Sequence, residues 1–373
     1  MNFESAFTDI CARIADLIGR TSGGKDDAVS AETVSDTEFN ELALELFRLQ
    51  FETNAPFRTL CEARAILPGK VDDWRQIPPM PAAAFKEREV TSLEPDQRTH
   101  VFHSSGTTDQ APSRHFHNDD SLDLYEASLK PWFVRNVLSA GSDGRSEVVR
   151  FGVLTPKQVE APNSSLVHMF DVVSQELGDD NTAWLGGCDA DGAWSVAVDM
   201  VVAFLEDSES GGRPVVLLGT AFLFVQLVDA LDERGLSFRL PAGSQIMETG
   251  GYKGRSREMS KQELHRLIGQ SLGVKLSDIV REYGMSELSS QAYATGDGPF
   301  RFPPWARAQI VSPESGQEAE KGETGLIRVF DLANVRSVAP LQTEDLGVRR
   351  NDGFELLGRA ALAEPRGCSR MTI

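Results

Sequence analysis

The sequence has few cysteines and no surplus of positive charge, and both shortages narrow the range of possible functions. Its 373 residues include 4 cysteines, which lie far apart and form no CxxC motif and no Cys/His pair at zinc-binding spacing. A structural zinc site and a disulfide framework are therefore not expected, and thiols in a reducing cytoplasm fit this pattern. Lys and Arg number 37 against 56 Asp and Glu, which gives a net charge of −19. Nucleic acid and anionic membranes require a basic surface, so neither is expected as a partner.

Long hydrophobic runs are also missing. The longest uncharged apolar stretch, Pro214 to Val228, is interrupted by Gly219 and Gln226. It is shorter than the roughly 20 residues that span a bilayer. The first residues carry Glu4 and Asp9, where a signal peptide would have positive charge. We therefore expect a cytoplasmic protein without membrane insertion, and its length predicts two or three domains.

Strand and helix patterns alternate along the middle of the chain. Short apolar runs predict strands, and apolar residues at helical spacing predict helices. The predicted strands are Val148–Leu154, Pro214–Gly219 and Gln245–Glu248, and the predicted helices are Ser164–Leu177, Ala221–Arg234 and Lys261–Leu272. Repetition of strand, turn and helix indicates an α/β fold with mainly parallel sheets flanked by helices.

The two ends of the chain differ from this middle part. A polar stretch at 21–37 predicts a loop, and the apolar spacing after it predicts a helix that starts at Ser35 or Asp36. After residue 300, turns and shorter strands predict a smaller β-rich subdomain. The expected domains are an α/β core with an N-terminal helical segment over 1–300, the β-rich subdomain over 301–359, and a short tail over 360–373.

A loop rich in hydroxyl groups carries the strongest local chemical signal. It reads Ser104-Ser105-Gly106-Thr107-Thr108-Asp109. Hydroxyls packed around a glycine give a loop whose backbone N–H groups and side chains can surround a polyphosphate. The spacing GxxxxGK[ST] of a Walker A loop is absent. The same composition also suits an ordinary turn, so the loop alone leaves both interpretations open.

Two further segments follow the loop in the chain. In Tyr283-Gly284-Met285-Ser286-Glu287, an aromatic ring and a carboxylate lie close enough to stack a base and bind Mg²⁺. Ser286 is equally suited to cap a helix. Thr343–Gly347 contains Asp345 and precedes Gly358-Arg359. An Asp-Gly pair between them is also typical of a β-hairpin turn. Local turn chemistry explains each segment, but it does not explain their order.

In this order the segments resemble the phosphate loop, the YGxTE motif, the TGD motif and the hinge Gly-Arg of the adenylate-forming superfamily. That superfamily includes acyl-CoA ligases, adenylation domains and luciferases. Within it, the chain most resembles the acyl-protein synthetases of the LuxE family. The closer resemblance lies in Ile77–Pro81 with Phe85-Lys86, Glu248–Gly254, Ser164–Met169 and Arg366–Ser369. It covers nearly the whole chain after residue 35.

The resemblance implies a set of nucleotide-binding residues. They are Ser104, Ser105, Gly106, Thr107, Thr108, Tyr283, Gly284, Ser286, Asp345 and Arg359. The loop residues would hold the phosphates of ATP and Tyr283 would stack on adenine. Asp345 would accept both ribose hydroxyls, and Arg359 would lie near the ribose or the α-phosphate. Glu287 would coordinate Mg²⁺, so ATP and Mg²⁺ are the expected cofactors. Asp109 departs from the glycine that normally ends the family's phosphate loop.

Substrate-binding residues are also implied: His168, Thr220, Gly250 and Gly251. His168 equally suits a hydrogen-bonded histidine of the core. Thr220 ends a predicted strand, and open α/β sheets bind ligands at the carboxyl ends of their strands. The lid domain of fully sized relatives, with its catalytic lysine, is not expected, because the last lysine is Lys321. Lys253 is our candidate substitute, although an ordinary solvated lysine fits it as well.

Cys368 lies between Arg366 and Arg370 and matches the cysteine that accepts the acyl group in the family. Neighbouring arginines favour the thiolate, which is the nucleophilic form. The implied activity is that of an ATP-dependent acyl-protein synthetase. It converts a carboxylic acid, expected to be a fatty acid, into acyl-AMP and then into a thioester on Cys368, for transfer to a partner reductase or carrier protein. Two alternatives stay open: a ligase that acylates coenzyme A or a carrier protein, and a nucleotide- or acyl-binding subunit without turnover.

Overall fold

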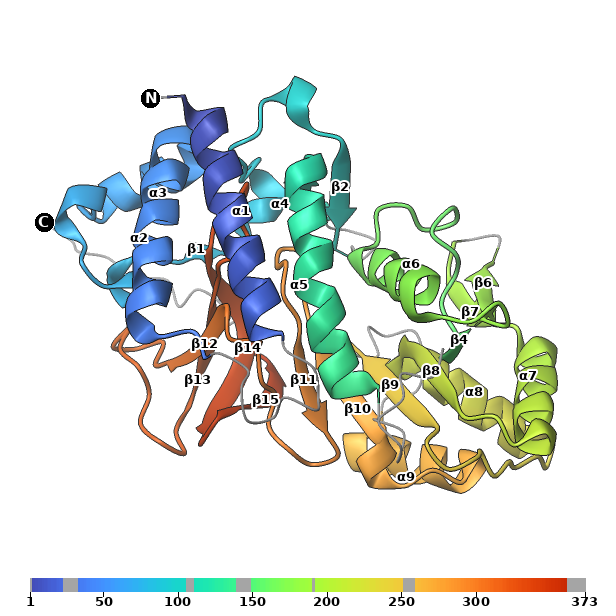
Figure 1. Cartoon of the computed structure of the whole chain (residues 1–373). Helices are drawn as coiled ribbons and strands as arrows, with labels where there is room; N and C mark the ends of the chain where they lie inside the picture. Colours follow the sequence, from blue (N-terminus) through green and yellow to red (C-terminus); the bar gives the residue numbers. More distant parts are fainter. Residues whose placement is uncertain are drawn as a thin grey trace, which may run out of the picture.

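The computed structural model describes residues 2–22, 33–104, 111–138, 149–189, 192–250 and 259–360. Two large sheets with helices packed around them make up most of the described residues (Figure 1). The six-stranded sheet and its helices lie on the right of the view, and the five-stranded sheet and the N-terminal helices lie on the left.

The six-stranded sheet has the strand order β11-β10-β9-β8-β4-β5. Its strands are β4 (Arg150–Val153), β5 (Ala183–Trp184), β8 (Val215–Thr220), β9 (Gln245–Thr249), β10 (Ile279–Tyr283) and β11 (Ala292–Thr295). All neighbours run parallel except β10 and β11. Every residue of β8 is buried, as expected for a parallel strand that is covered on both faces.

Helices cover both faces of this sheet. On one face lie α5 (Asp119–Val137) and α6 (Ser165–Leu177), and on the other lie α7 (Val198–Gly211), α8 (Ala221–Glu233) and α9 (Lys261–Leu272). Successive residues of β8 point to opposite faces, so Val216 and Leu218 pack with α5 and α6 while Leu217 packs with α7 and α8. The six-stranded sheet is thus the middle layer of three.

The five-stranded sheet has the order β1-β14-β13-β12, with β15 paired to β14. Its strands are β1 (Met80–Pro81), β12 (Ala306–Val311), β13 (Thr324–Asp331), β14 (Pro340–Arg350) and β15 (Gly353–Arg359). The helices α1 (Phe3–Thr21), α2 (Asp36–Thr53) and α3 (Ala55–Ala63) precede it in the chain, and their buried residues share one hydrophobic cluster with those of β13 and β14. This cluster contains residues from before and after position 300, where the sequence predicted a domain boundary. The predicted domain boundaries stay a prediction.

Smaller elements complete the described fold. They are the helix α4 (Ala84–Glu87), the hairpin β2 (His100–His103) with β3 (Arg114–His117), the hairpin β6 (Gly186–Cys188) with β7 (Trp194–Val196), and short 3₁₀ turns at Pro68–Lys70, Trp74–Gln76, Pro95–Gln97 and Leu276–Asp278. Helix α5 contacts both α1 and α6, so it connects the two halves of the molecule. Among the described helices, none has the length and apolar character needed to cross a bilayer.

The α/β fold class is confirmed, with a mainly parallel sheet and a second sheet that is mostly antiparallel. The predicted helices at 164–177, 221–234 and 261–272 correspond to α6, α8 and α9, and Ser35 caps α2 by accepting a hydrogen bond from the backbone of Glu38. The helices α5 and α7 and the strands β10 and β14 were not predicted.

Removal of the Phe39 side chain tests the packing of α2 on the five-stranded sheet. Phe39 is fully buried, and its ring centroid lies 5.4 Å from that of Trp74 and 5.8 Å from that of Phe330 on β13. We expect Phe39→Ala to lower the free energy of unfolding by about 3–5 kcal/mol, measured by urea denaturation, because a large core side chain leaves a cavity. Glu41→Ala, on the exposed face of the same helix, should change it by less than about 0.5 kcal/mol. Equal effects of the two variants would contradict this packing.

Candidate functional site

Two of the predicted motifs meet where the two sheets adjoin. Tyr283 is the last residue of β10, and its hydroxyl donates a hydrogen bond of 2.9 Å to Asp345 Oδ2 on β14. Arg359 ends β15 directly opposite Asp345, with 3.7 Å between Arg359 Nε and Asp345 Oδ1. The structure therefore brings together three residues that the sequence assigned to the adenosine end of a nucleotide.

The ring of Tyr283 is held by a cluster of phenylalanines. Its centroid lies 5.9, 6.2 and 5.4 Å from the ring centroids of Phe300, Phe302 and Phe354. Burial raises the pKa of Tyr283 well above its ordinary value, so the hydroxyl stays protonated and donates to Asp345. This packing fixes the plane of the ring.

Asp345 is mostly buried, with 14% of its side chain exposed. Burial raises its pKa, while the hydrogen bond from Tyr283 and the positive charge of Arg359 act in the opposite direction. These two groups favour the ionised carboxylate. A carboxylate offers about four acceptor positions, so the bond from Tyr283 leaves others for hydroxyl groups of a ligand.

The base of the predicted phosphate loop lies beside Glu287. Ser104 and Ser113 stand at the two ends of this loop and bind each other, since Ser113 N donates to Ser104 Oγ at 2.9 Å. The hydroxyls of Ser113 and Ser286 lie 3.3 Å apart, and Ser286 Oγ donates to Glu287 Oε2 at 3.0 Å. Because Ser286 gives its only hydroxyl proton to Glu287, Ser113 is the donor to Ser286. A chain of hydroxyls thus connects the loop to the carboxylate.

His115 supports the same segment from β3. Its Nδ1 lies 2.8 Å from the backbone carbonyl of Ser286, which can only accept, so Nδ1 carries the proton. Burial lowers the pKa of His115 to about 4, and the ring is therefore neutral near pH 7. The contact fixes the backbone of Ser286 without placing a positive charge in the site.

Glu282 was not identified from the sequence, and it is a buried carboxyl beside Tyr283. Thr249 Oγ1 on β9 donates to Glu282 Oε2, and burial raises the pKa of Glu282 to about 7. A Cβ on Gly284 would lie 2.2 Å from Glu282 Oε1, so any larger residue there would displace the Glu282 carboxyl group. The charged pair Arg281-Glu282 within an apolar stretch was a signal that could have pointed to this position.

The predicted substrate residues occupy separate positions. His168 on α6 is buried and hydrogen-bonded, with Nε2 at 3.0 Å from Glu126 Oε1 and Nδ1 at 3.1 Å from Gln158 Nε2. This is the geometry of an interior histidine, and its role in binding an acid stays a prediction. Thr220 ends β8, and its buried hydroxyl has no hydrogen-bond partner among the described residues. Gly250 follows β9 with a φ of 72°, in the region that favours glycine.

Several predicted residues lie outside the described part of the chain. They are Ser105, Gly106, Thr107, Thr108, Gly251, Lys253 and Cys368. Among the described residues there is no group of three His, Cys, Asp or Glu side chains that could hold a metal ion. A site with one carboxylate, such as Glu287, still suits Mg²⁺, because this ion commonly uses one or two protein carboxylates together with phosphate oxygens and water.

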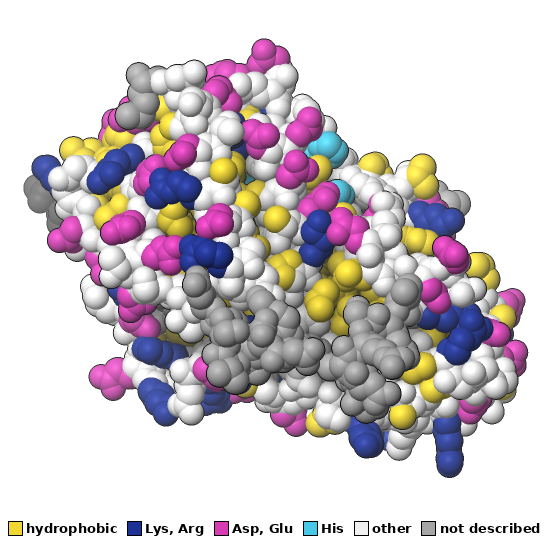
Figure 2. Space-filling model, in the orientation of Figure 1, with side chains coloured by type: hydrophobic (Ala, Val, Ile, Leu, Met, Phe, Trp, Pro, Cys, Tyr) yellow, Lys and Arg dark blue, Asp and Glu magenta, His cyan; other side chains and the backbone are white. Residues whose placement is uncertain are grey.

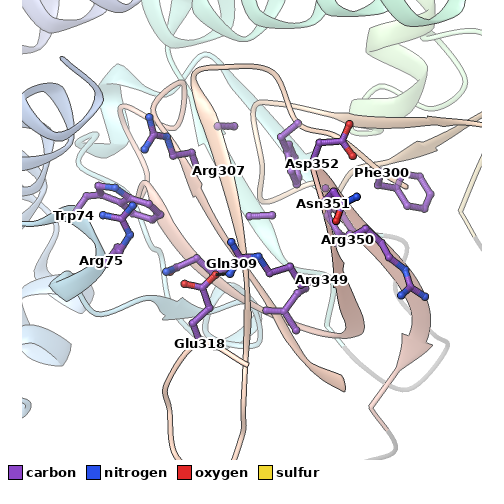
Figure 3. Close-up of a pocket in the computed structure, with 16 residues that line it drawn as sticks. Trp74, Arg75, Phe300, Arg307, Gln309, Glu318, Arg349, Arg350, Asn351 and Asp352 are labelled. Atoms are coloured by element: carbon purple, nitrogen blue, oxygen red, sulfur yellow. Dashed lines mark hydrogen bonds and ion pairs between the residues drawn. The ribbon is translucent and has the colours of Figure 1, made fainter. Parts of the chain in front are cut away.

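A cavity of about 330 Å³ lies on the five-stranded sheet between Trp74 and the turn after β14 (Figure 3). Arginines at its rim are paired with acids, as Arg307 is with Asp36 and Arg349 is with Glu318. None of the predicted site residues lines it. On the visible face of the molecule, acidic and basic side chains are interspersed and form no broad basic patch (Figure 2).

Comparisons with known proteins give the family and the fold of the chain. A family model described as "Acyl-protein synthetase, LuxE" matches residues 26–372. The long-chain-fatty-acid–luciferin-component ligase of Vibrio harveyi is 21% identical over 87% of this chain and 84% of its own, and that of Aliivibrio fischeri is 19% identical over 88% and 86%. A 2-hydroxyisobutyryl-CoA ligase in complex with 2-HIB-AMP and CoA is similar in structure, with TM-scores of 0.64 in an open conformation and 0.65 in the thioesterification state. Both alignments have 14% identity and cover 88% of this chain and 71% and 69% of the ligase, so they show a shared fold.

Replacement of Tyr283 by phenylalanine tests the contact between the two sheets. The change removes the hydroxyl that donates to Asp345, and loss of a donor to a carboxylate raises the pKa of that carboxylate. We expect the pKa of Asp345 to rise in Tyr283→Phe, measured by NMR titration of protein with ¹³C-labelled aspartate carboxyls. Tyr293→Phe makes the same change on β11, where the hydroxyl faces Met169, and should leave this pKa unchanged. An unchanged pKa in both variants would show that Tyr283 does not bind Asp345.

Proposed function

The chain belongs to the LuxE acyl-protein synthetase family, and we propose that it activates a fatty acid with ATP and then holds the acyl group on Cys368. One observation carries this proposal. Asp345 contacts both Tyr283 and Arg359, and these three residues form the proposed adenosine site. The base of the hydroxyl-rich loop contacts Ser286, which follows the end of the same strand by three residues and precedes Glu287. Adenosine and phosphate sites are therefore adjacent, as ATP requires.

The adenosine end of ATP fits the pocket formed by Tyr283, Asp345 and Arg359. The resemblance assigns the Tyr283 ring to adenine, and the phenylalanine cluster holds the plane of that ring. The carboxylate of Asp345 accepts the two ribose hydroxyls, and hydrogen bonds to a charged acceptor are about twice as strong as neutral ones. Arg359, whose side chain is 72% exposed, supplies positive charge toward the α-phosphate.

The phosphate end fits the loop that begins at Ser104. Ser105, Gly106, Thr107 and Thr108 supply backbone N–H groups and hydroxyls for the β- and γ-phosphates. Glu287 is the residue that would hold Mg²⁺, because one of its oxygens accepts from Ser286 and the other has acceptor capacity left. When bound, the ion neutralises charge on the phosphate oxygens.

The first half-reaction joins the acid to AMP. A carboxylate oxygen of the acid attacks the α-phosphorus, the bond from this phosphorus to the bridging oxygen breaks, and pyrophosphate leaves. Preorganised positive charge at the α-phosphate stabilises the transition state. We assign this role to Lys253, which belongs to the segment between β9 and α9, together with Arg359.

The acid itself is assigned to the carboxyl ends of β8 and β9. Thr220 ends β8, Gly250 directly follows β9, and Gly251 is the next residue in the chain. Ligands of open α/β sheets bind at this edge. The two relatives whose names specify a long-chain fatty acid support an aliphatic substrate. The ring of His168 packs against the ring of Phe102, with 5.4 Å between the two centroids. Because Phe102 is two residues before the phosphate loop, this contact supports a position of His168 near the acid.

The second half-reaction moves the acyl group to a thiol. The Cys368 thiolate attacks the acyl carbonyl carbon, the bond to the phosphate oxygen of AMP breaks, and AMP leaves. The described cysteines are poor alternatives, since burial raises the pKa of Cys11 to about 11 and that of Cys61 to about 12, and the pKa of Cys188 is also raised. A partner reductase or carrier protein would then receive the acyl group by transfer from the thioester.

Two variants separate the half-reactions. Cys368→Ser should keep acid-dependent exchange of pyrophosphate into ATP within about twofold of the wild type and should lose the stable acyl-protein, because adenylation does not use the thiol. Asp345→Ala should lower both activities by 10²-fold or more, since the ribose is no longer positioned. Exchange is measured with labelled pyrophosphate, and acyl-protein by hydroxylamine-labile label after denaturation. Cys368→Ser that still carries such label, or Asp345→Ala that exchanges normally, would contradict these assignments.

A further inference from the structure

The segment that follows Glu287 is buried and connects β10 to β11. Residues 286–291 are all buried, although they form neither helix nor strand, so their backbone groups need partners from elsewhere. Two side chains from the end of β13, Asp331 and Asn334, supply several of them. They are 41 to 47 residues away from their partners in the chain and belong to none of the motifs that the sequence singled out.

Asn334 binds the segment at Glu287 itself. Its side chain is 1% exposed, and its Nδ2 donates to the backbone carbonyl of Glu287 at 2.8 Å. Its Oδ1 accepts from Ser289 Oγ at 2.6 Å. A second bond from Nδ2 to the carbonyl of Val338, at 3.2 Å, fixes the amide to its own turn. The peptide group after Glu287 is therefore fixed by a side chain that is itself immobilised.

Asp331 binds the next residues of the same segment. It is fully buried and accepts from the backbone of Ser289 at 3.0 Å and from Ser290 Oγ at 2.8 Å. It also accepts from the backbone of Ala333 at 3.0 Å. We call the side chains of Asn334 and Asp331 the cradle. Together they hold the chain from Glu287 to Ser290.

We propose that this cradle positions Glu287 for Mg²⁺ binding, and that Asn334 is its most direct positioning residue. The inference rests on the proposed function of Glu287. The glutamate side chain has one hydrogen bond, from Ser286, so its direction depends on how its backbone is held. Partners that orient a metal-ligating residue typically change metal affinity by 10- to 100-fold when they are removed.

The test compares Asn334→Ala with Asn54→Ala. Asn54 is a fully buried asparagine whose side chain makes two bonds, from Nδ2 to the carbonyl of Ser337 and from the backbone of Phe57 to Oδ1, and neither bond is to the 287–290 segment. Both variants should lower the melting temperature. Only Asn334→Ala should weaken, by about 10-fold, the binding of Mg²⁺ to the complex of the protein with a non-hydrolysable ATP analogue, measured by calorimetry. It should raise by the same factor the free Mg²⁺ concentration that gives half-maximal pyrophosphate exchange at saturating ATP and acid. The rate at saturating Mg²⁺ should stay within about threefold of the wild type.

A milder variant covers the case in which Asn334→Ala does not fold. Ser289→Ala removes only the hydroxyl that donates to Asn334 Oδ1 and should raise the Mg²⁺ requirement by about twofold to fivefold. The positioning role is overturned if Asn334→Ala needs no more Mg²⁺ than Asn54→Ala does. If Asn334→Ala is unfolded, the same comparison is made with Ser289→Ala.

Glu287→Gln distinguishes failure of the inference from failure of the proposed function. It should raise the Mg²⁺ requirement by itself, and Asn334→Ala should add nothing to it, because two residues that act on one ligand are not additive. A normal requirement in Glu287→Gln removes Glu287 from the metal site and overturns the proposed role of that residue. If Glu287→Gln raises the Mg²⁺ requirement and the effect of Asn334→Ala adds to it in full in the double variant, only the positioning role of the cradle is overturned.

Discussion

The hydrogen bond from Tyr283 to Asp345 joins the two sheets of the molecule, and the candidate site depends on it. Tyr283 ends a strand of the six-stranded sheet, and Asp345 lies within the five-stranded sheet. Neither sheet contains the proposed adenosine site by itself. Formation of the site therefore requires that the sheets pack against each other in one register, which the aromatic cluster around Tyr283 and the helix α5 enforce.

Burial of polar groups is the second feature of the site. His115, Ser286, Glu287, Asp331 and Asn334 are all buried, and each has at least one hydrogen bond to a group from another part of the chain or to its neighbour. Unpaired buried polar groups are costly, so the network has one arrangement in which its members are satisfied. Hydrogen bonds thus hold the segment after Tyr283 without regular secondary structure, and a segment held in this way suits the proposed site, which would place ATP before chemistry.

The sequence predicted the elements and motifs whose signals are local. Helices α6 and α9 each bury one face, α8 is buried on most sides in its first half, and the apolar residues of all three were readable. Helix α5 was missed because its broad buried face includes the polar residues Ser121 and Ser128, and because it contains Pro131. The strand β10 was hidden by Arg281 and Glu282, whose charges suggest a loop although Glu282 is buried against Thr249. The cradle had no signal, since its contacts join residues more than 40 positions apart.

The central claim is that one chain both activates an acid and becomes acylated. The most direct measurement incubates the wild-type protein with Mg²⁺ and labelled fatty acids of several lengths, with and without ATP, and counts hydroxylamine-labile label on the denatured protein. The account predicts label that depends on ATP and approaches one acyl group per chain. No label on the protein, together with AMP release that begins when coenzyme A is added, would contradict it and would identify a coenzyme A ligase instead.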